Sequence, residues 1–179
     1  MAEPPGPANT LAVLGLGSNL PVRQRWLDLG LEILLAGPST LLLATPRWNT
    51  IPRGAPPQPD YLNQLLLVRG PRDGWGWLEL AQRAELAAGR RRLVSKGPRT
   101  LDVDVLLVEG LTCSSPKLRL PHPAILDRPH LLAGVAALVP DWKLEGSPLT
   151  LAELARARLG GSWRQPVPLR GAGDPPTRG

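Results

Sequence analysis

Residues 97–108 read GPRTLDVDVLLV, and this stretch decides the fold. Leucine and valine alternate there with Asp102 and Asp104, and such alternation is typical of a β-strand, whose successive side chains point to opposite faces. The apolar side chains therefore face a core, and both carboxylates face the other side, about 6.6 Å apart along the backbone. We expect a sheet that packs on one face and carries acidic groups on the other.

Hydrophobic patterns on the N-terminal side of this strand predict the rest of the sheet. They indicate, in chain order, a strand, a helix, two strands and a second helix: residues 11–17, 22–36, 40–50, 61–68 and 76–88. Pro46 interrupts the second strand, because proline cannot donate to a sheet ladder. The order β-α-β-β-α-β predicts an α+β fold of the ferredoxin-like class, an antiparallel sheet with helices packed on it.

The C-terminal part adds further elements to this core. A short strand and two helices, the C-terminal helical additions, are expected at residues 117–120, 130–138 and 149–159. Proline and glycine concentrate at both ends of the chain. We therefore expect a disordered tail over residues 1–9, one domain over residues 10–160, and a Pro/Gly-rich tail over residues 161–179.

Composition narrows the class of protein. The formal net charge is +6, and arginine supplies most of the 21 cationic side chains. Guanidinium groups bind phosphate through paired hydrogen bonds, so a polyanionic ligand is favoured, either a nucleotide or a nucleic acid. No apolar run approaches the roughly 20 residues of a membrane-spanning helix, and no secretory signal is recognisable. One cysteine, Cys113, allows neither an internal disulfide nor a thiolate metal cage, so we expect a cytoplasmic protein.

The two aspartates and the loop before them indicate the chemistry. Two carboxylates on one face of a core strand need a cation, and carboxylate oxygens suit Mg²⁺. The alternatives are a solvent-facing pair and a pair capped by arginines. Five cations precede or flank the aspartates: Arg90, Arg91, Arg92, Lys96 and Arg99. Their density favours a nucleoside triphosphate with Mg²⁺, and a nucleic-acid patch or a solvated charge run remains as an alternative.

Common nucleotide-binding motifs do not account for this chemistry. Residues 15–20 (GLGSNL) lack the third glycine of a dinucleotide fingerprint, and the sequence has no Walker loop. Gly15 and Gly17 instead predict a tight turn after the first strand, either a plain turn or one beside a small ligand.

Five segments of the chain resemble the 6-hydroxymethyl-7,8-dihydropterin pyrophosphokinase family. They are, in chain order, residues 16–20 (LGSNL), 59–63 (PDYLN), 82–92 (QRAELAAGRRR), 97–107 (GPRTLDVDVLL) and 120–128 (LPHPAILDR). The resemblance implies transfer of the diphosphate group of ATP to the hydroxymethyl group of a reduced pterin, in folate biosynthesis. It also implies an enzyme that needs Mg²⁺, uses ATP as co-substrate, acts as a monomer on small molecules, and binds neither nucleic acid nor membrane.

The same resemblance implies residue roles. Asp102 and Asp104 hold two Mg²⁺ ions and are catalytic together with Arg90 and Arg92. The residues implied at ATP are Gln82, Arg90, Arg92, Arg99, Val105, Lys117, Arg119, His122 and Arg128. The residues implied at the pterin are Thr50, Tyr61, Asn63, Asp102 and His130. Glu85 accompanies Gln82 on one face of the predicted helix.

The chain departs from the family at two positions and leaves two alternatives open. His130 stands where relatives often have an aromatic ring that stacks on the pterin, and Lys96 stands where many have tryptophan. A non-catalytic RNA-binding module is the first alternative, although it needs aromatic residues on the sheet and this chain has no phenylalanine and one tyrosine. A related diphosphotransferase with a different acceptor is the second.

Overall fold

The structure is a computed structural model that describes residues 9–52, 57–90 and 97–160, together with the backbone of residues 169–170. Its elements, in chain order, are β1 (Asn9–Ser18), α1 (Arg23–Leu34), β2 (Thr40–Ala44), β3 (Trp48–Thr50), β4 (Tyr61–Pro71), α2 (Gly74–Ala87), β5 (Asp102–Val108), β6 (Cys113–Ser114), β7 (Arg119–Leu120), α3 (Ala124–Asp127), α4 (Pro129–Leu138), α5 (Leu151–Leu159) and β8 (Leu169–Arg170).

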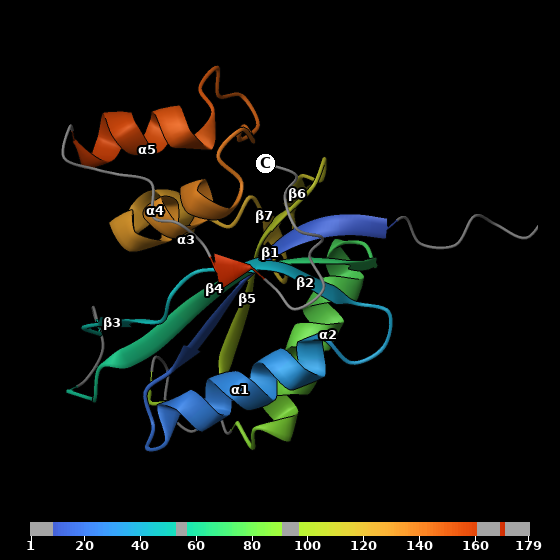
Figure 1. Ribbon diagram of the computed structural model, residues 1–179, viewed down its shortest axis with the longest axis vertical. Helices are drawn as coiled ribbons and strands as arrows, with labels where there is room; N and C mark the ends of the chain where they lie inside the picture. Colours follow the sequence, from blue (N-terminus) through green and yellow to red (C-terminus); the bar gives the residue numbers. More distant parts are fainter. Residues whose placement is uncertain (1–8, 53–56, 91–96, 161–168, 171–179) are drawn as a thin grey trace, which may run out of the picture.

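The main sheet is antiparallel, with strand order β5-β1-β4-β2-β8 and with β3 paired to β4 (Figure 1). In this arrangement β1 and β4 lie at the centre. Helix α1 connects β1 to β2, which lies beyond β4, and α2 connects β4 to β5, which lies beyond β1. The α+β, ferredoxin-like prediction is confirmed, and the helical additions after the sheet are present as α3, α4 and α5.

One predicted strand is divided in the structure, and a short strand lies in a stretch that was expected to be a tail. Residues 40–50 form β2 and β3, so the interruption expected at Pro46, which has no N–H to donate, separates two strands. Both pieces still pair with β4. The strand β8 lies within the stretch 161–179 that was expected to be a tail, and its backbone pairs with β2. A two-residue pairing is too short to leave a hydrophobic pattern in the sequence.

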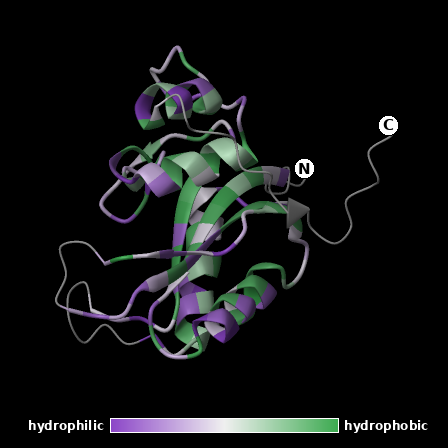
Figure 2. Cartoon of the chain, turned by 60° about the vertical axis from the view of Figure 1, so that its left-hand side comes forward, coloured by the Kyte–Doolittle hydropathy of each residue, from purple (hydrophilic) through white to green (hydrophobic). Residues whose placement is uncertain are grey.

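Helices cover both faces of the sheet. One hydrophobic cluster lies between the sheet and α1 and α2, and a second joins the other face of the sheet to α4 and to α5, which packs on α4 (Figure 1). The alternation in β5 places Val103 and Val105 in the first cluster. Apolar residues are concentrated in the strands between the helical layers, whereas polar residues lie on the outer helix surfaces (Figure 2).

The second helical layer packs closely on β4 because of one glycine. A Cβ on Gly134 of α4 would lie only 2.7 Å from Cδ1 of Leu65, so any larger residue would push the helix or the leucine away. A capping box formed by Thr150 and Glu153 begins α5, the outermost helix of this layer. Within the described ranges, no helix has both the length and the hydropathy needed to cross a membrane.

Candidate active site

Three neighbouring strands form the floor of a cavity of about 640 Å³. Asn63 of β4, Gly17 of β1 and Asp102 of β5 lie side by side in one row, and Gly15 and Asp104 lie in the next. A Cβ on Gly17 would approach Oδ1 of Asn63 to 3.4 Å. The two glycines therefore leave a hollow between the polar side chains of β4 and the carboxylates of β5. The prediction of a tight turn at these glycines is wrong, since both lie within β1.

One wall of this cavity is built from the paired strands β3 and β4. Asn63 donates from Nδ2 to Oγ1 of Thr50 at 2.9 Å and to the carbonyl of Trp48 at 3.4 Å. Thr50 lies opposite Tyr61 in the strand pairing. The donor end of the Asn63 amide is thus held by protein groups, and its oxygen lies over Gly17. Burial raises the pKa of Tyr61 above its usual value, so its hydroxyl stays protonated.

The first turn of α4 and Arg128, the residue before this helix, form another wall of the cavity. His130 lies against the indole of Trp48, with ring centroids 6.3 Å apart and planes tilted by 58°. Arg128 and His130 both line the cavity. An imidazole held by an indole thus occupies the place where the sequence comparison with the family expects an aromatic ring.

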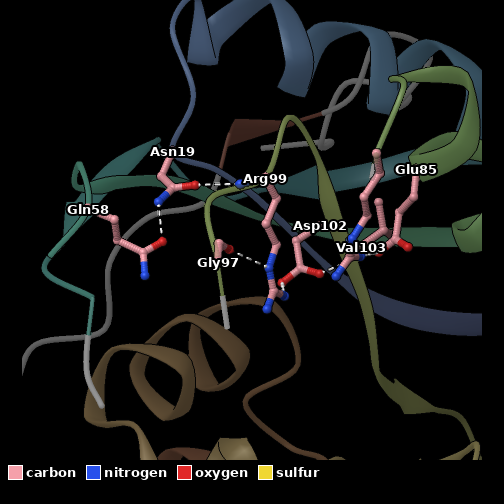
Figure 3. A network of polar contacts seen from close by, with 8 residues as sticks. Asn19, Gln58, Glu85, Gly97, Arg99, Asp102 and Val103 are labelled. Carbon is pink, nitrogen blue, oxygen red and sulfur yellow. Dashed lines mark hydrogen bonds and ion pairs between the residues drawn. The ribbon is translucent and has the colours of Figure 1, made fainter. Parts of the chain in front are cut away.

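Arginines neutralise Asp102. Its Oδ1 lies 2.7 Å from Nη1 of Arg90, and its Oδ2 accepts a hydrogen bond from Nη1 of Arg99 at 2.6 Å. Arg90 also pairs with Glu85 of α2, and Glu85 in turn accepts from the backbone N–H of Val103 at 2.9 Å. This chain of contacts is drawn in Figure 3. Of the alternatives left open by the sequence, a carboxylate capped by arginines therefore describes Asp102.

Asp104 is in a different electrostatic position. Among the described residues it forms no ion pair, whereas Asp102 forms two. Burial, reinforced by the neighbouring Asp102 carboxylate, raises the pKa of Asp104 to about 7. A carboxyl group in this state gains from any cation that arrives beside it. A bound cation would therefore stabilise the charged form of Asp104 more than that of Asp102, which already has two arginine partners.

A second cavity, of about 350 Å³, adjoins the first at Asp104, which lines both. The other lining residues include Val105 of β5 and the basic or polar side chains of Lys117, Arg119 and His122. Nδ1 of His122 accepts from the backbone N–H of Ala124 at 3.2 Å. Burial, with the positive charge of Arg128, lowers the pKa of His122, so its ring is neutral at neutral pH. Asp104 thus stands at the junction of a basic cavity and an amide- and aromatic-lined one.

The structure brings most of the predicted site residues to these two cavities. All five residues implied at the pterin line the larger one: Thr50, Tyr61, Asn63, Asp102 and His130. Of those implied at ATP, Val105, Lys117, Arg119 and His122 line the smaller cavity, and Arg99 and Arg128 line the larger.

Two residues implied at ATP, Gln82 and Arg90, line neither cavity, and a third lies outside the described residues. Gln82 is exposed on α2 and lines neither cavity, although Glu85 on the same helix is buried. Arg90 pairs with Asp102 and Glu85, so it lies beside the Asp102 carboxylate. Arg92, together with Arg91 and Lys96, lies outside the described residues.

Sequence reasoning missed two amides beside the site. Asn19 follows β1 and is only 1% exposed, and Gln58 lines the larger cavity. The side chain of Asn19 donates to Oε1 of Gln58 at 2.7 Å. The one available signal was an asparagine directly after a buried strand, where an amide has backbone groups to satisfy.

The carboxylates of the site suit Mg²⁺ better than a metal ion whose ligands all come from the protein. Within the described ranges, no group of three or more His, Cys, Asp or Glu side chains could hold a metal ion. Asp102 and Asp104 lie on the cavity floor, and Asp127 lines the larger cavity beside Arg128. Mg²⁺ typically takes one or two protein carboxylates and completes its shell with water and substrate phosphates. The carboxyl of Asp104, which forms no ion pair with another described residue and has a raised pKa, fits such a site.

Comparisons with known proteins agree on one family. Residues 13–140 match the family model described as 7,8-dihydro-6-hydroxymethylpterin-pyrophosphokinase. The chain is 35% identical over 138 residues to a 2-amino-4-hydroxy-6-hydroxymethyldihydropteridine pyrophosphokinase of Methylorubrum extorquens, covering 76% of this chain and 87% of the relative. The protein of the same name from Bacillus subtilis is 31% identical over 140 residues, covering 78% of this chain and 84% of the relative.

Solved structures agree with the fold. The chain superposes on the Plasmodium falciparum HPPK-DHPS A437G structure with a TM-score of 0.65 at 12% sequence identity. The match covers 86% of this chain and 46% of that one, so the chain spans about half the length of that structure. At this level of identity the likeness concerns the fold alone.

Proposed function

The chain belongs to the 7,8-dihydro-6-hydroxymethylpterin-pyrophosphokinase family, and we propose that it transfers the diphosphate group of ATP to the hydroxymethyl group of 6-hydroxymethyl-7,8-dihydropterin. AMP and the pterin diphosphate are the products, and the step belongs to folate biosynthesis. One observation carries the proposal: an amide- and aromatic-lined cavity and a basic cavity meet at Asp104.

The larger cavity suits the pterin. Tyr61 offers an aromatic face, and Oδ1 of Asn63 offers an acceptor to the N–H groups of the pterin edge. Because Thr50 and the Trp48 carbonyl already accept from Nδ2 of Asn63, the orientation of this amide is fixed before ligand binds. His130 faces the cavity from α4 and contributes a flat ring.

The smaller cavity suits the nucleotide. Lys117 and Arg119 provide positive charge for phosphate, and the neutral ring of His122 is a hydrogen-bonding group beside them. Val105 supplies apolar surface at the same place. Arg99 and Arg128 face the larger cavity, where they can bind the diphosphate group that moves toward the pterin. We include Gln82 and Arg92 among the nucleotide residues on the family resemblance alone.

Asp102 and Asp104 would hold the two Mg²⁺ ions of the reaction, since they lie in neighbouring rows on the cavity floor. When bound, Mg²⁺ neutralises charge on the transferring phosphate groups and polarises the phosphorus under attack. Arg90 and Arg99 form ion pairs with Asp102 and supply positive charge on its side of the site. Asp104 must lose its proton to act as a ligand, because its pKa is about 7.

The reaction itself asks the protein mainly for positioning. The pterin hydroxyl oxygen attacks the β-phosphorus, the bond from that phosphorus to the bridging oxygen of AMP breaks, and the hydroxyl proton leaves to solvent. We assign no general base. The arginines at the cavities stabilise the charge that develops on the transferring group and on AMP. MgATP would bind first and the pterin second.

We further propose that the enzyme works as a monomer on small molecules, without nucleic acid or membrane. The reducing cytoplasm is the proposed compartment, in line with a chain that has one cysteine.

The test is to incubate the purified protein with MgATP and the reduced hydroxymethylpterin and to separate the products by chromatography. We expect AMP and pterin diphosphate in equal amounts, and loss of both in Asp102→Asn and Asp104→Asn. Consumption of ATP without a pterin product would assign the enzyme to a different acceptor. Absence of binding to either substrate would contradict the proposal.

A further inference from the structure

Asn19 is a buried amide that joins two segments far apart in the sequence. Its side-chain Oδ1 accepts from the backbone N–H of Arg99 at 2.8 Å, and the backbone N–H of Asn19 donates to the carbonyl of Arg99 at 3.2 Å. At the other end, Nδ2 donates to Oε1 of Gln58 at 2.7 Å and to the carbonyl of Pro59 at 3.1 Å. Figure 3 shows Asn19 between Gln58 and Arg99.

Each of the two segments carries one half of the site. On one side, Arg99 extends its guanidinium to Asp102 at 2.6 Å, so its backbone position sets the place of a charge beside the metal ligands. On the other side, the residues held by Nδ2 lead directly into Tyr61, the first residue of β4. Arg23 holds the same segment, since its Nη1 donates to the carbonyl of Asp60 at 2.7 Å.

We propose that Asn19 is a positioning residue that sets the pterin-side strand and Arg99 at a fixed separation. The inference rests on the proposed function and goes beyond it, because the hydrogen bonds described for Asn19 go to Gln58, Pro59 and Arg99 and to none of the residues assigned to the pterin or the metal. An amide suits this task because it accepts at one end and donates at the other within one short side chain. Misplacement of reacting groups by about 1 Å can lower a rate roughly a hundredfold.

Two substitutions separate the ends of the amide. Asn19→Asp retains an oxygen that accepts from the Arg99 N–H but removes the donor to both Gln58 and Pro59, and Gln58→Ala removes the Gln58 acceptor and leaves the Pro59 acceptor in place. Both should raise the KM for the reduced pterin about tenfold, the effect of one to two lost hydrogen bonds, and leave kcat within about twofold. Asn19→Ala removes both ends, and its kcat should fall by a factor of about 10 to 100 as well.

The double variant tests whether the two residues act through one contact. In Asn19→Asp combined with Gln58→Ala, the rise in KM should be well below the product of the single effects, because both changes act on the same hydrogen bond. Fully multiplicative effects would mean that the residues act independently, and they would contradict the proposal. If Asn19→Ala does not fold, the Asn19→Asp and Gln58→Ala pair decides the question.

Gln64→Ala is the matched control. Gln64 is also a buried amide, on β4, and it donates to the carbonyl of Thr45 at 3.1 Å and accepts from Nε of Arg47 at 3.1 Å, but it lines neither cavity. Its loss should lower the melting temperature and leave KM and kcat unchanged.

Amide hydrogen exchange provides a readout that does not depend on turnover. In the ligand-free protein, Asn19→Ala should speed exchange at the Arg99 N–H, whereas Gln58→Ala should leave it protected. The positioning role is wrong if Asn19 variants lower the melting temperature alone, as Gln64→Ala does, or if Asn19→Asp lowers kcat as much as Asn19→Ala. A wild-type protein that makes no pterin diphosphate would instead contradict the proposed function.

Discussion

One face of the sheet has two ends that differ in chemistry although the same strands run through both. At the open end, the inward positions of β1, β4 and β5 are Gly17, Asn63 and Asp102, with Asp104 beside them. Farther along the same strands, α4 covers the face with α5 packed on it, and the side chains there are valine and leucine: Val13, Leu67 and Leu107.

The contrast between the two ends indicates that the polar residues at the open end serve ligand binding and not the stability of the fold. Backbone geometry and alternation are the same at both ends, so they do not explain why one end is polar. The covered end gains stability from burial of apolar surface. The open end holds a carboxyl group whose pKa is raised to about 7, which means that its charged form is destabilised in the folded protein. Such a group is retained because a ligand, not the fold, uses its charge.

The largest effect should follow removal of that charge. Asp104→Asn should lower the rate of pterin diphosphate formation by about a thousandfold or more, because the cation at the junction of the cavities loses a ligand. The rate is measured by chromatography of AMP and the pterin product. Asp141→Asn, the same change at an exposed position, is the control and should retain full activity. Activity near that of wild type in Asp104→Asn would remove the distinction between the two ends.

A change at the covered end should lower stability and leave activity nearly unchanged. Leu67 is buried against the second helical layer and lines neither cavity. Leu67→Ala should lower the free energy of unfolding by about 3 kcal/mol, through lost burial and the cavity that remains. Its kcat, measured well below the melting temperature, should stay within about twofold of wild type. A stable but inactive variant would show that the covered end also takes part in the reaction.

The pH dependence of stability sharpens the comparison. The pKa of Asp104 is about 7 in the folded protein and near its ordinary 3.8 in the unfolded chain. Because the folded state holds the proton more tightly, this group's contribution to stability is full at low pH and is lost as pH rises from about 4 to about 7. Asp104→Asn should therefore be more stable than wild type above pH 7, by up to about 4 kcal/mol. Urea unfolding across this pH range measures the difference, which should shrink toward about pH 4.

The smallest effect concerns the rim of the open end. His130→Phe should leave pterin affinity unchanged or tighten it a few-fold, since a phenyl ring stacks on a flat ligand better than imidazole does. Trp48 already lies against this position, so the new ring has an aromatic neighbour. Fluorescence titration with the reduced pterin measures the affinity. A large loss would show that His130 contributes a hydrogen bond instead of a stacking surface.

Local patterns in the sequence predicted most of the fold and the floor of the site. Alternation over residues 101–105 places Asp102 and Asp104 on the face opposite the first hydrophobic cluster, as the structure has them. The strand and helix order followed from periodicity in the same way, because a repeat of about 2 or 3.6 residues depends on neighbours alone.

Contacts between distant segments could not be predicted. Asn19 lies 39 residues from Gln58 and 80 from Arg99, and a hydrogen bond between loops leaves no periodic signal. The burial of Glu85 was not predicted either, because a carboxylate on a helix is usually exposed. Here it is buried because Arg90 and the N–H of Val103 satisfy it. Both cases depend on partners that only the folded chain brings together.

The central claim is that the open end is kept polar for catalysis and at a cost to stability. It is tested most directly by measuring turnover and urea unfolding on one preparation of Asp104→Asn at about pH 8. We expect the rate of pterin diphosphate formation to fall about a thousandfold while the unfolding midpoint rises. An active variant, or an inactive one that is also less stable than wild type, would contradict it.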